Sequence, residues 1–129
     1  MTDALSPTDV AAFFDDFVVA FAQMDGPLIA HRYHVPYLAI HADGRHDLFT
    51  SAEAVGVYFQ RIVDAYRRDG CRTCRYRDLA VVPLGADAVL ATVTWDLIDT
   101  AGAVTSSWTE SYNLLRIPDG LRVYASTDH

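Results

Sequence analysis

The hydrophobic periodicity of the chain changes once, near residue 70, and this change restricts the fold more than any other sequence feature. Before it, apolar residues recur every three or four positions, which is typical of amphipathic helices. After it, apolar residues alternate with period two in four runs, over residues 72–84, 88–98, 104–117 and 121–127. The short, glycine-containing turns between these runs favour antiparallel hairpins. The sequence therefore predicts an α+β fold, with helices on one face of a strongly curved, mainly antiparallel sheet.

The first helical segment carries a clear start signal. Ser6 is the expected cap, Pro7 takes the first helical position, and Asp9 places an acid where the helix dipole favours one. Apolar residues at helical spacing follow: Val10, Phe13, Phe14, Phe17, Phe21 and Met24. This aromatic stripe predicts that the helix packs on a large apolar surface.

Two more helices are expected before the period changes. Asp25-Gly26 ends the first helix, and a short helix over residues 27–34 should stop before Pro36. Residues 37–41 predict a strand, followed by a tight turn and a second short strand. Thr50 and Glu53 have the spacing of a capping box, which predicts the start of a third helix that ends at Asp69-Gly70.

Length and charge exclude several classes of protein. The 129 residues suit one domain, and the net charge of −7 does not suit binding to phosphates, so no nucleic-acid partner is expected. All ten basic residues are arginines, which excludes lysine Schiff-base chemistry and a P-loop. The first residues lack the pattern of a signal peptide, and no apolar run reaches the ~18 residues of a membrane span. We expect a cytoplasmic protein with no membrane partner.

Several features together resemble the NTF2-like superfamily, particularly its SnoaL-like members. They are the order of elements, the Phe-rich first helix, the Asp-Gly turn before the third helix, and the closing run from Trp95 through Trp108 and Glu110-Ser111-Tyr112-Asn113 to Ala125-Ser126-Thr127. The resemblance covers nearly the whole chain and implies one cone-shaped domain over residues 1–129, commonly dimeric, with a pocket between sheet and helices. Such pockets serve isomerases, dehydratases, cyclases, epoxide hydrolases and non-catalytic binders alike. Ketosteroid isomerases of this fold use a tyrosine on the first helix, where this chain has only phenylalanines, so the resemblance does not extend to that activity.

Glutamate is scarce in this chain, and one of its two glutamates falls at an unusual place. Strand parity puts Glu110 with Trp108 and Tyr112 on the face toward the helices, and Trp95 on the same face of the preceding run. Apolar surroundings raise the pKa of a carboxyl group toward neutrality, as a general acid or base requires. We therefore predict Glu110 as a proton-transfer residue in a pocket walled by Trp95, Trp108 and Tyr112.

Two other interpretations of Glu110 stay open at this level. The carboxylate could form a structural ion pair with Arg116 or Arg122, since such pairs also perturb carboxylates. A bulge could also reverse the strand parity and turn Glu110 to solvent.

A second group of polar aromatic residues lies within residues 31–41. Tyr33, His34 and Tyr37 are predicted ligand-binding residues, and His41 is a predicted catalytic residue. Imidazole suits proton shuttling, and a tyrosine hydroxyl can polarise a carbonyl group. The alternative is that the tyrosines are core aromatics and the histidines are partly exposed.

The two cysteines, Cys71 and Cys74, together with His31 and His34, supply the four ligands of a Cys2His2 zinc site. However, residues three apart on a strand point to opposite faces unless a bulge intervenes. We therefore predict reduced thiols and no metal site.

Together these features predict small-molecule binding in a cone-shaped hydrophobic cavity, and acid-base chemistry of isomerase or lyase type is compatible with it. The expected partner is a small, largely apolar molecule, and no cofactor is expected. The resemblance implies a homodimer, for which the polar Ser/Thr face of residues 105–113 is the predicted contact surface. The alternative is a non-catalytic dimeric interaction or accessory domain whose side chains fill the cavity, so the sequence leaves open whether the chain is an enzyme.

Overall fold

The computed structural model describes residues 4–129, which form three helices and one six-stranded sheet. The elements along the chain are α1 (Pro7–Ala22), α2 (Gly26–Ala30), β1 (Tyr33–Ile40), β2 (His46–Phe49), α3 (Ala52–Arg68), β3 (Cys71–Leu84), β4 (Ala88–Asp99), β5 (Val104–Ile117) and β6 (Gly120–Asp128). None of the helices in this described part has both the length and the apolar character needed to cross a membrane.

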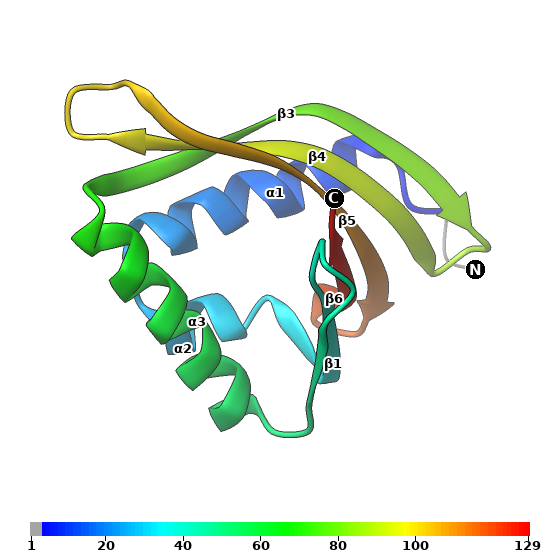
Figure 1. Cartoon of the computed structure of the whole chain (residues 1–129). Helices are drawn as coiled ribbons and strands as arrows, with labels where there is room; N and C mark the ends of the chain where they lie inside the picture. Colours follow the sequence, from blue (N-terminus) through cyan, green and yellow to red (C-terminus); the bar gives the residue numbers. More distant parts are fainter. Residues whose placement is uncertain (1–3) are drawn as a thin grey trace.

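The sheet has the strand order β2-β1-β6-β5-β4-β3. Strands β1 and β6 run parallel, and every other neighbouring pair is antiparallel. Figure 1 shows the sheet curving around the helices, which lie on its concave side. The predicted α+β fold, with three helices on a curved and mainly antiparallel sheet, is confirmed.

Helix α1 begins and packs as its sequence predicts. The Ser6 hydroxyl accepts a hydrogen bond from the Asp9 amide at 3.1 Å, and the Asp9 carboxylate accepts one from the Ser6 amide at 3.0 Å. The aromatic stripe is buried, and the ring centroid of Phe14 lies 5.3 Å from that of Tyr112 and 6.0 Å from that of Trp95. Such contacts stabilise the fold beyond the apolar area that they bury.

The boundary between α2 and β1 differs from the prediction. The helix ends at Ala30 rather than residue 34, and β1 begins at Tyr33, so Pro36 lies inside the strand. A proline cannot donate to a neighbouring strand. The pairing of β1 with β6 shifts register between Tyr33 and Leu38, and Pro36 lies in this irregular stretch.

The predicted capping box of α3 is also wrong. Ser51, not Thr50, is the cap, and its hydroxyl accepts a hydrogen bond from the Ala54 amide at 3.1 Å. This cap places Glu53 at the second helical position, one residue too early to reach back to the cap. Glu53 still lies in the first turn, where the helix dipole favours an acid.

Helices α2 and α3 approach each other closely at Gly26. Its amide donates to Gln60 Oε1 at 2.7 Å, and Gln60 Nε2 donates to the Met24 carbonyl oxygen at 3.2 Å. A Cβ atom on Gly26 would lie 2.6 Å from the Gln60 backbone nitrogen and would overlap the Gly56 carbonyl. This contact fixes the position of α3 against the rest of the helix layer.

The two faces of β4 differ as predicted, with one exception. Val89, Ala91, Val93, Trp95 and Leu97 are all buried on the inner face. On the outer face Asp96 is also buried, where its carboxylate accepts hydrogen bonds from Ser107 at 2.6 Å, Arg75 at 2.9 Å and Arg77 at 3.1 Å. These donors hold the pKa of Asp96 well below its usual range.

Candidate functional site

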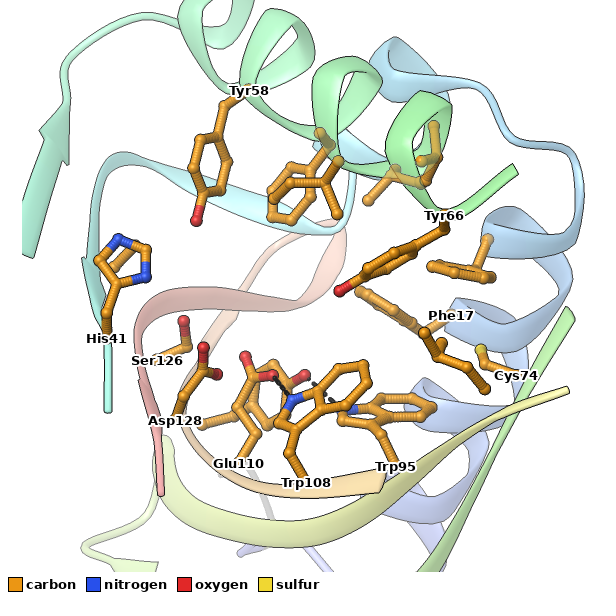
Figure 2. A pocket seen from close by; sticks show the side chains of 18 of the residues that line it. Phe17, His41, Tyr58, Tyr66, Cys74, Trp95, Trp108, Glu110, Ser126 and Asp128 are labelled. Carbon is orange, nitrogen blue, oxygen red and sulfur yellow. Dashed lines mark hydrogen bonds between the residues drawn. The ribbon is translucent and has the colours of Figure 1, made fainter. Parts of the chain in front are cut away.

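A cavity of about 310 Å³ lies between α3 and the concave face of the sheet (Figure 2). Its wall is mostly aromatic and aliphatic, and the rings are those of Phe17, Phe21, Tyr33, Tyr58, Phe59, Tyr66, Trp95, Trp108 and Tyr112. The polar groups on the wall are those of His41, Cys74, Glu110, Ser126, Asp128 and His129. A concave, largely apolar wall with few polar groups is the usual form of a small-molecule site.

Glu110 lies on β5 between Trp108 and Tyr112, and its side chain enters the cavity (Figure 2). The indole nitrogen of Trp108 donates to Glu110 Oε1 at 2.9 Å. Trp95 Nε1 donates to the Tyr112 hydroxyl at 2.7 Å, and that hydroxyl is in turn hydrogen-bonded to Glu110. The predicted wall residues Trp95, Trp108 and Tyr112 thus all line the cavity, and Trp108 and Tyr112 are bonded to this carboxyl group.

A second carboxyl group, Asp128, lies directly beside Glu110. The two residues are partners in the pairing of β5 with β6, and their side chains are hydrogen-bonded. Figure 2 shows both carboxyl groups directed into the cavity. Sequence reasoning missed Asp128, because the predicted strand ended at residue 127 and a pairing partner cannot be read from one strand alone.

Burial and the neighbouring carboxyl group change the proton affinity of Glu110. Removal from water raises its pKa to about 8, and the negative charge of Asp128 acts in the same direction. The hydrogen bonds from Trp108 and Tyr112 oppose this rise because they stabilise the carboxylate. Near neutral pH Glu110 therefore keeps its proton in most molecules.

Two tyrosines of α3 complete the cavity opposite the acids. Figure 2 shows the hydroxyl groups of Tyr58 and Tyr66 directed into the space above Glu110 and Asp128. Burial raises the pKa of Tyr58 to about 12 and that of Tyr66 further, so both hydroxyls stay protonated and can donate hydrogen bonds. Helical periodicity placed these tyrosines on the buried face of the helix but did not show that they face a carboxyl pair.

Of the site residues predicted within residues 31–41, some line the cavity and others do not. Tyr33 lines the cavity, and His41 lies at its edge, where its Nε2 is 2.9 Å from Asp47 Oδ2. Tyr37 is buried beside the cavity, and its hydroxyl is 2.6 Å from Ser126 Oγ. His34 lies outside the cavity, with Nδ1 3.0 Å from the Pro36 carbonyl oxygen.

The arginines proposed as structural partners of Glu110 lie elsewhere. Arg116 Nε is 3.2 Å from Asp87 Oδ1, and Arg116 also donates to the Ala86 carbonyl oxygen. Arg122 donates to the Leu121 carbonyl oxygen. Within residues 4–129, Glu110 forms no ion pair with an arginine.

Both cysteines are buried, contrary to the expectation that they face opposite sides of the sheet. The register of β3 against β4 shifts between Cys71 and Thr73, and this bulge lets both side chains turn inward. Burial raises the pKa of the Cys74 thiol to about 12, so it is not a reactive thiolate. The described part of the chain contains no group of three or more metal-ligating side chains.

Three helices on the concave face of a curved six-stranded sheet, with a cavity between the layers, define an NTF2-like protein. Comparison of the sequence with protein families gives a narrower assignment. The chain belongs to the family described as NTF2-like protein (DUF6841), whose model matches residues 8–129. Comparison with curated protein sequences gives no match.

Solved structures with the same fold have low sequence identity to this chain. Aln2 from a Streptomyces species superposes with a TM-score of 0.77 at 18% identity, covering 98% of this chain and 94% of that one. An NTF2-like protein with a cystatin-like fold from Novosphingobium aromaticivorans gives 0.73 at 13% identity, with 94% and 79% covered. The yeast UBP3-associated protein BRE5 gives 0.72 at 14% identity, with 98% and 97% covered. At these identities the similarity shows the fold alone.

Proposed function

We propose that this protein binds a small, largely apolar molecule in the cavity and that Glu110 exchanges a proton with it. The observation that carries the proposal is the Glu110 carboxyl group, which lies in a largely aromatic cavity beside Trp108 and Tyr112 and whose pKa is raised to about 8. The alternative, a non-catalytic dimeric interaction or accessory domain with a filled cavity, is less well supported because the side chains of Trp95, Trp108 and Tyr112 leave a space of about 310 Å³.

The chemistry follows from the raised pKa of Glu110 and from the neighbouring carboxyl group of Asp128. A group with a pKa close to the working pH is present both as acid and as base, which suits proton transfer in either direction. Protonated Glu110 can donate to a carbonyl oxygen or a leaving group, and its carboxylate can remove a proton next to a carbonyl group. Isomerisation and elimination need these steps and no cofactor.

Proton transfer can be tested with 2-tetralone, a bicyclic ketone with acidic protons next to its carbonyl group. In D2O, nuclear magnetic resonance follows the replacement of these protons by deuterium. We expect the wild type to exceed the rate in buffer, and Glu110→Gln to lower the protein-dependent rate by a factor of about 100 or more. Glu53→Gln is the matched control because Glu53 is exposed and lies outside the cavity. Equal rates for wild type and Glu110→Gln would contradict the role of Glu110.

We further infer that the protein is a homodimer whose contact surface is the outer face of β5. Ser107 is exposed there, and Thr105 adds a second exposed hydroxyl. Buried Asp96, with its arginine partners, makes this part of the outer face rigid and polar. Sedimentation velocity at several protein concentrations tests the proposal, and a monomer at all of them would contradict it.

A further inference from the structure

The charged groups of the cavity have one sign. Glu110 and Asp128 are acidic, none of the lining residues within 4–129 is an arginine, and the sequence contains no lysine. The two lining histidines have other partners, since His41 is bonded to Asp47 and His129 Nε2 is 2.8 Å from Ser111 Oγ. The cavity therefore offers negative charge with no fixed cation beside it.

Other acidic residues of this protein form ion pairs with arginines. Asp96 is held by Arg75 and Arg77, and Asp87 lies 3.2 Å from Arg116 Nε. The hydrogen bonds to Glu110 come instead from neutral donors, the indole of Trp108 and the hydroxyl of Tyr112. A charge that is removed from water is costly unless it is paired. The half-buried carboxyl pair lacks the arginine partner that Asp96 and Asp87 have.

Aromatic rings surround the same acids. The ring centroids of Tyr66 and Trp108 are 6.3 Å apart. Figure 2 shows Trp108 beside Glu110, and it shows Tyr58 and Tyr66 across the cavity from the two acids. The faces of such rings attract cations, and this attraction is stronger where water is excluded. Rings and carboxyl groups thus favour the same kind of ligand group.

We propose that the ligand of this cavity is a small organic cation, with an amine or ammonium group between the Glu110–Asp128 pair and the rings of Tyr66 and Trp108. The inference rests on the proposed function, because it names the ligand class for that same site. A volume of about 310 Å³ is at the lower end of the ~300–1,000 Å³ found for small-molecule sites and suits a ligand of one or two rings. The cation would supply the charge that no arginine provides.

The two tryptophans give a direct assay, because Trp95 and Trp108 are the only ones in the chain and both line the cavity. The probes are benzyltrimethylammonium and its uncharged carbon isostere, neopentylbenzene, which differ in charge and hardly in shape. Titration of the tryptophan fluorescence at pH 9, where most of Glu110 is ionised, should show that the cation binds at least tenfold more tightly than neopentylbenzene.

The preference should depend on pH, and benzyltrimethylammonium has no proton of its own to lose. The titratable groups that face Glu110 are Asp128 of β6, Tyr58 and Tyr66 of α3, Tyr33 and Tyr37 of β1, Tyr112 of β5, and the edge residues His41 and His129. The tyrosines and the Cys74 thiol of β3, which also lines the cavity, remain neutral at pH 9. We therefore assign the change from pH 6 to pH 9 to the acids, and the variants below test the two histidines. We expect the cation to bind several-fold more tightly at pH 9 than at pH 6, and the isostere to bind equally at both.

Variants separate the acids from the histidines. The double variant Glu110→Gln, Asp128→Asn keeps the side-chain shapes and should lose the preference for the cation, while Glu53→Gln should retain it. Circular dichroism checks that the variants fold, and the pH dependence of the wild type tests the proposal without any variant.

Three outcomes would overturn this inference. They are equal or tighter binding of neopentylbenzene by the wild type, a preference for the cation that survives in the double variant, and an affinity for the cation that does not change with pH. In each of these cases a molecule still binds, so the proposed function stands. If neither probe changes the tryptophan fluorescence, both the inference and ligand binding in the cavity fail.

Discussion

Replacement of Asp128 by asparagine should lower the pKa of Glu110 by about 2 units. Directly opposite residues of an antiparallel pair lie about 5 Å apart, and Glu110 and Asp128 are such partners. Two unit charges at this distance, with an effective dielectric constant of ~20, interact by about 3 kcal/mol, which corresponds to about 2 pH units. The pKa of Glu110 should therefore fall from about 8 to about 6, and burial should keep it above the ordinary value of 4.5.

The composition of the chain makes this measurement simple. Because the protein contains only Glu53 and Glu110, labelling glutamate with ¹³C at the carboxyl carbon gives two side-chain signals. The Glu53→Gln variant assigns them, and a pH titration of each signal gives its midpoint. The exposed Glu53 serves as the internal reference in the same sample.

Two results would refute the reasoning. A wild-type midpoint for Glu110 close to that of free glutamate would show that the cavity is well hydrated and that burial does not perturb the acid. A midpoint that stays near 8 in Asp128→Asn would show that burial alone raises the pKa and that the two acids do not interact. Circular dichroism of the variant should match that of the wild type in either case.

Three further predictions concern stability, each measured by chemical denaturation. Between pH 4.5 and 8 Glu110 is protonated in the folded state and ionised in the unfolded state. The free energy of unfolding should therefore fall by roughly 1.4 kcal/mol per pH unit in this range, and Glu110→Gln should remove this slope. Gly26→Ala should cost about 1–3 kcal/mol, because its Cβ overlaps α3; an unchanged stability would show that α2 shifts freely. Asp96→Ala should cost about 1–3 kcal/mol at pH 7, because Arg75 and Arg77 lose a shared acceptor; an equal midpoint would contradict this.

Local features of the sequence predicted most of the fold. The aromatic stripe and the Ser6 cap specify α1, since both depend on residues within a few positions of each other. The period-two pattern of β4 put Val93 and Trp95 on the inner face correctly, because β4 has no bulge between residues 88 and 97 in its pairing with β5. The same pattern led to Glu110 as the residue most worth testing.

Errors arose where strands are irregular. In β6 the pairing with β5 shifts between Asn113 and Leu114, so Val123 and Ser126 are both buried although their parity differs. A regular alternation from Val123 would have turned Asp128 away from the cavity. The bulge in β3 misled the prediction for Cys71 in the same way.

The sequence by itself determined which segments form helices and strands and that an acid lies among aromatic residues, because these depend on periodicity and local caps. Only the tertiary structure decided that Asp128 lies beside Glu110 and that α3 places Tyr58 and Tyr66 opposite them. It also decided that no arginine lines the cavity within residues 4–129. These relations join residues far apart in the chain. They depend on strand register and on how the helix layer sits on the sheet, and neither is encoded in a single segment.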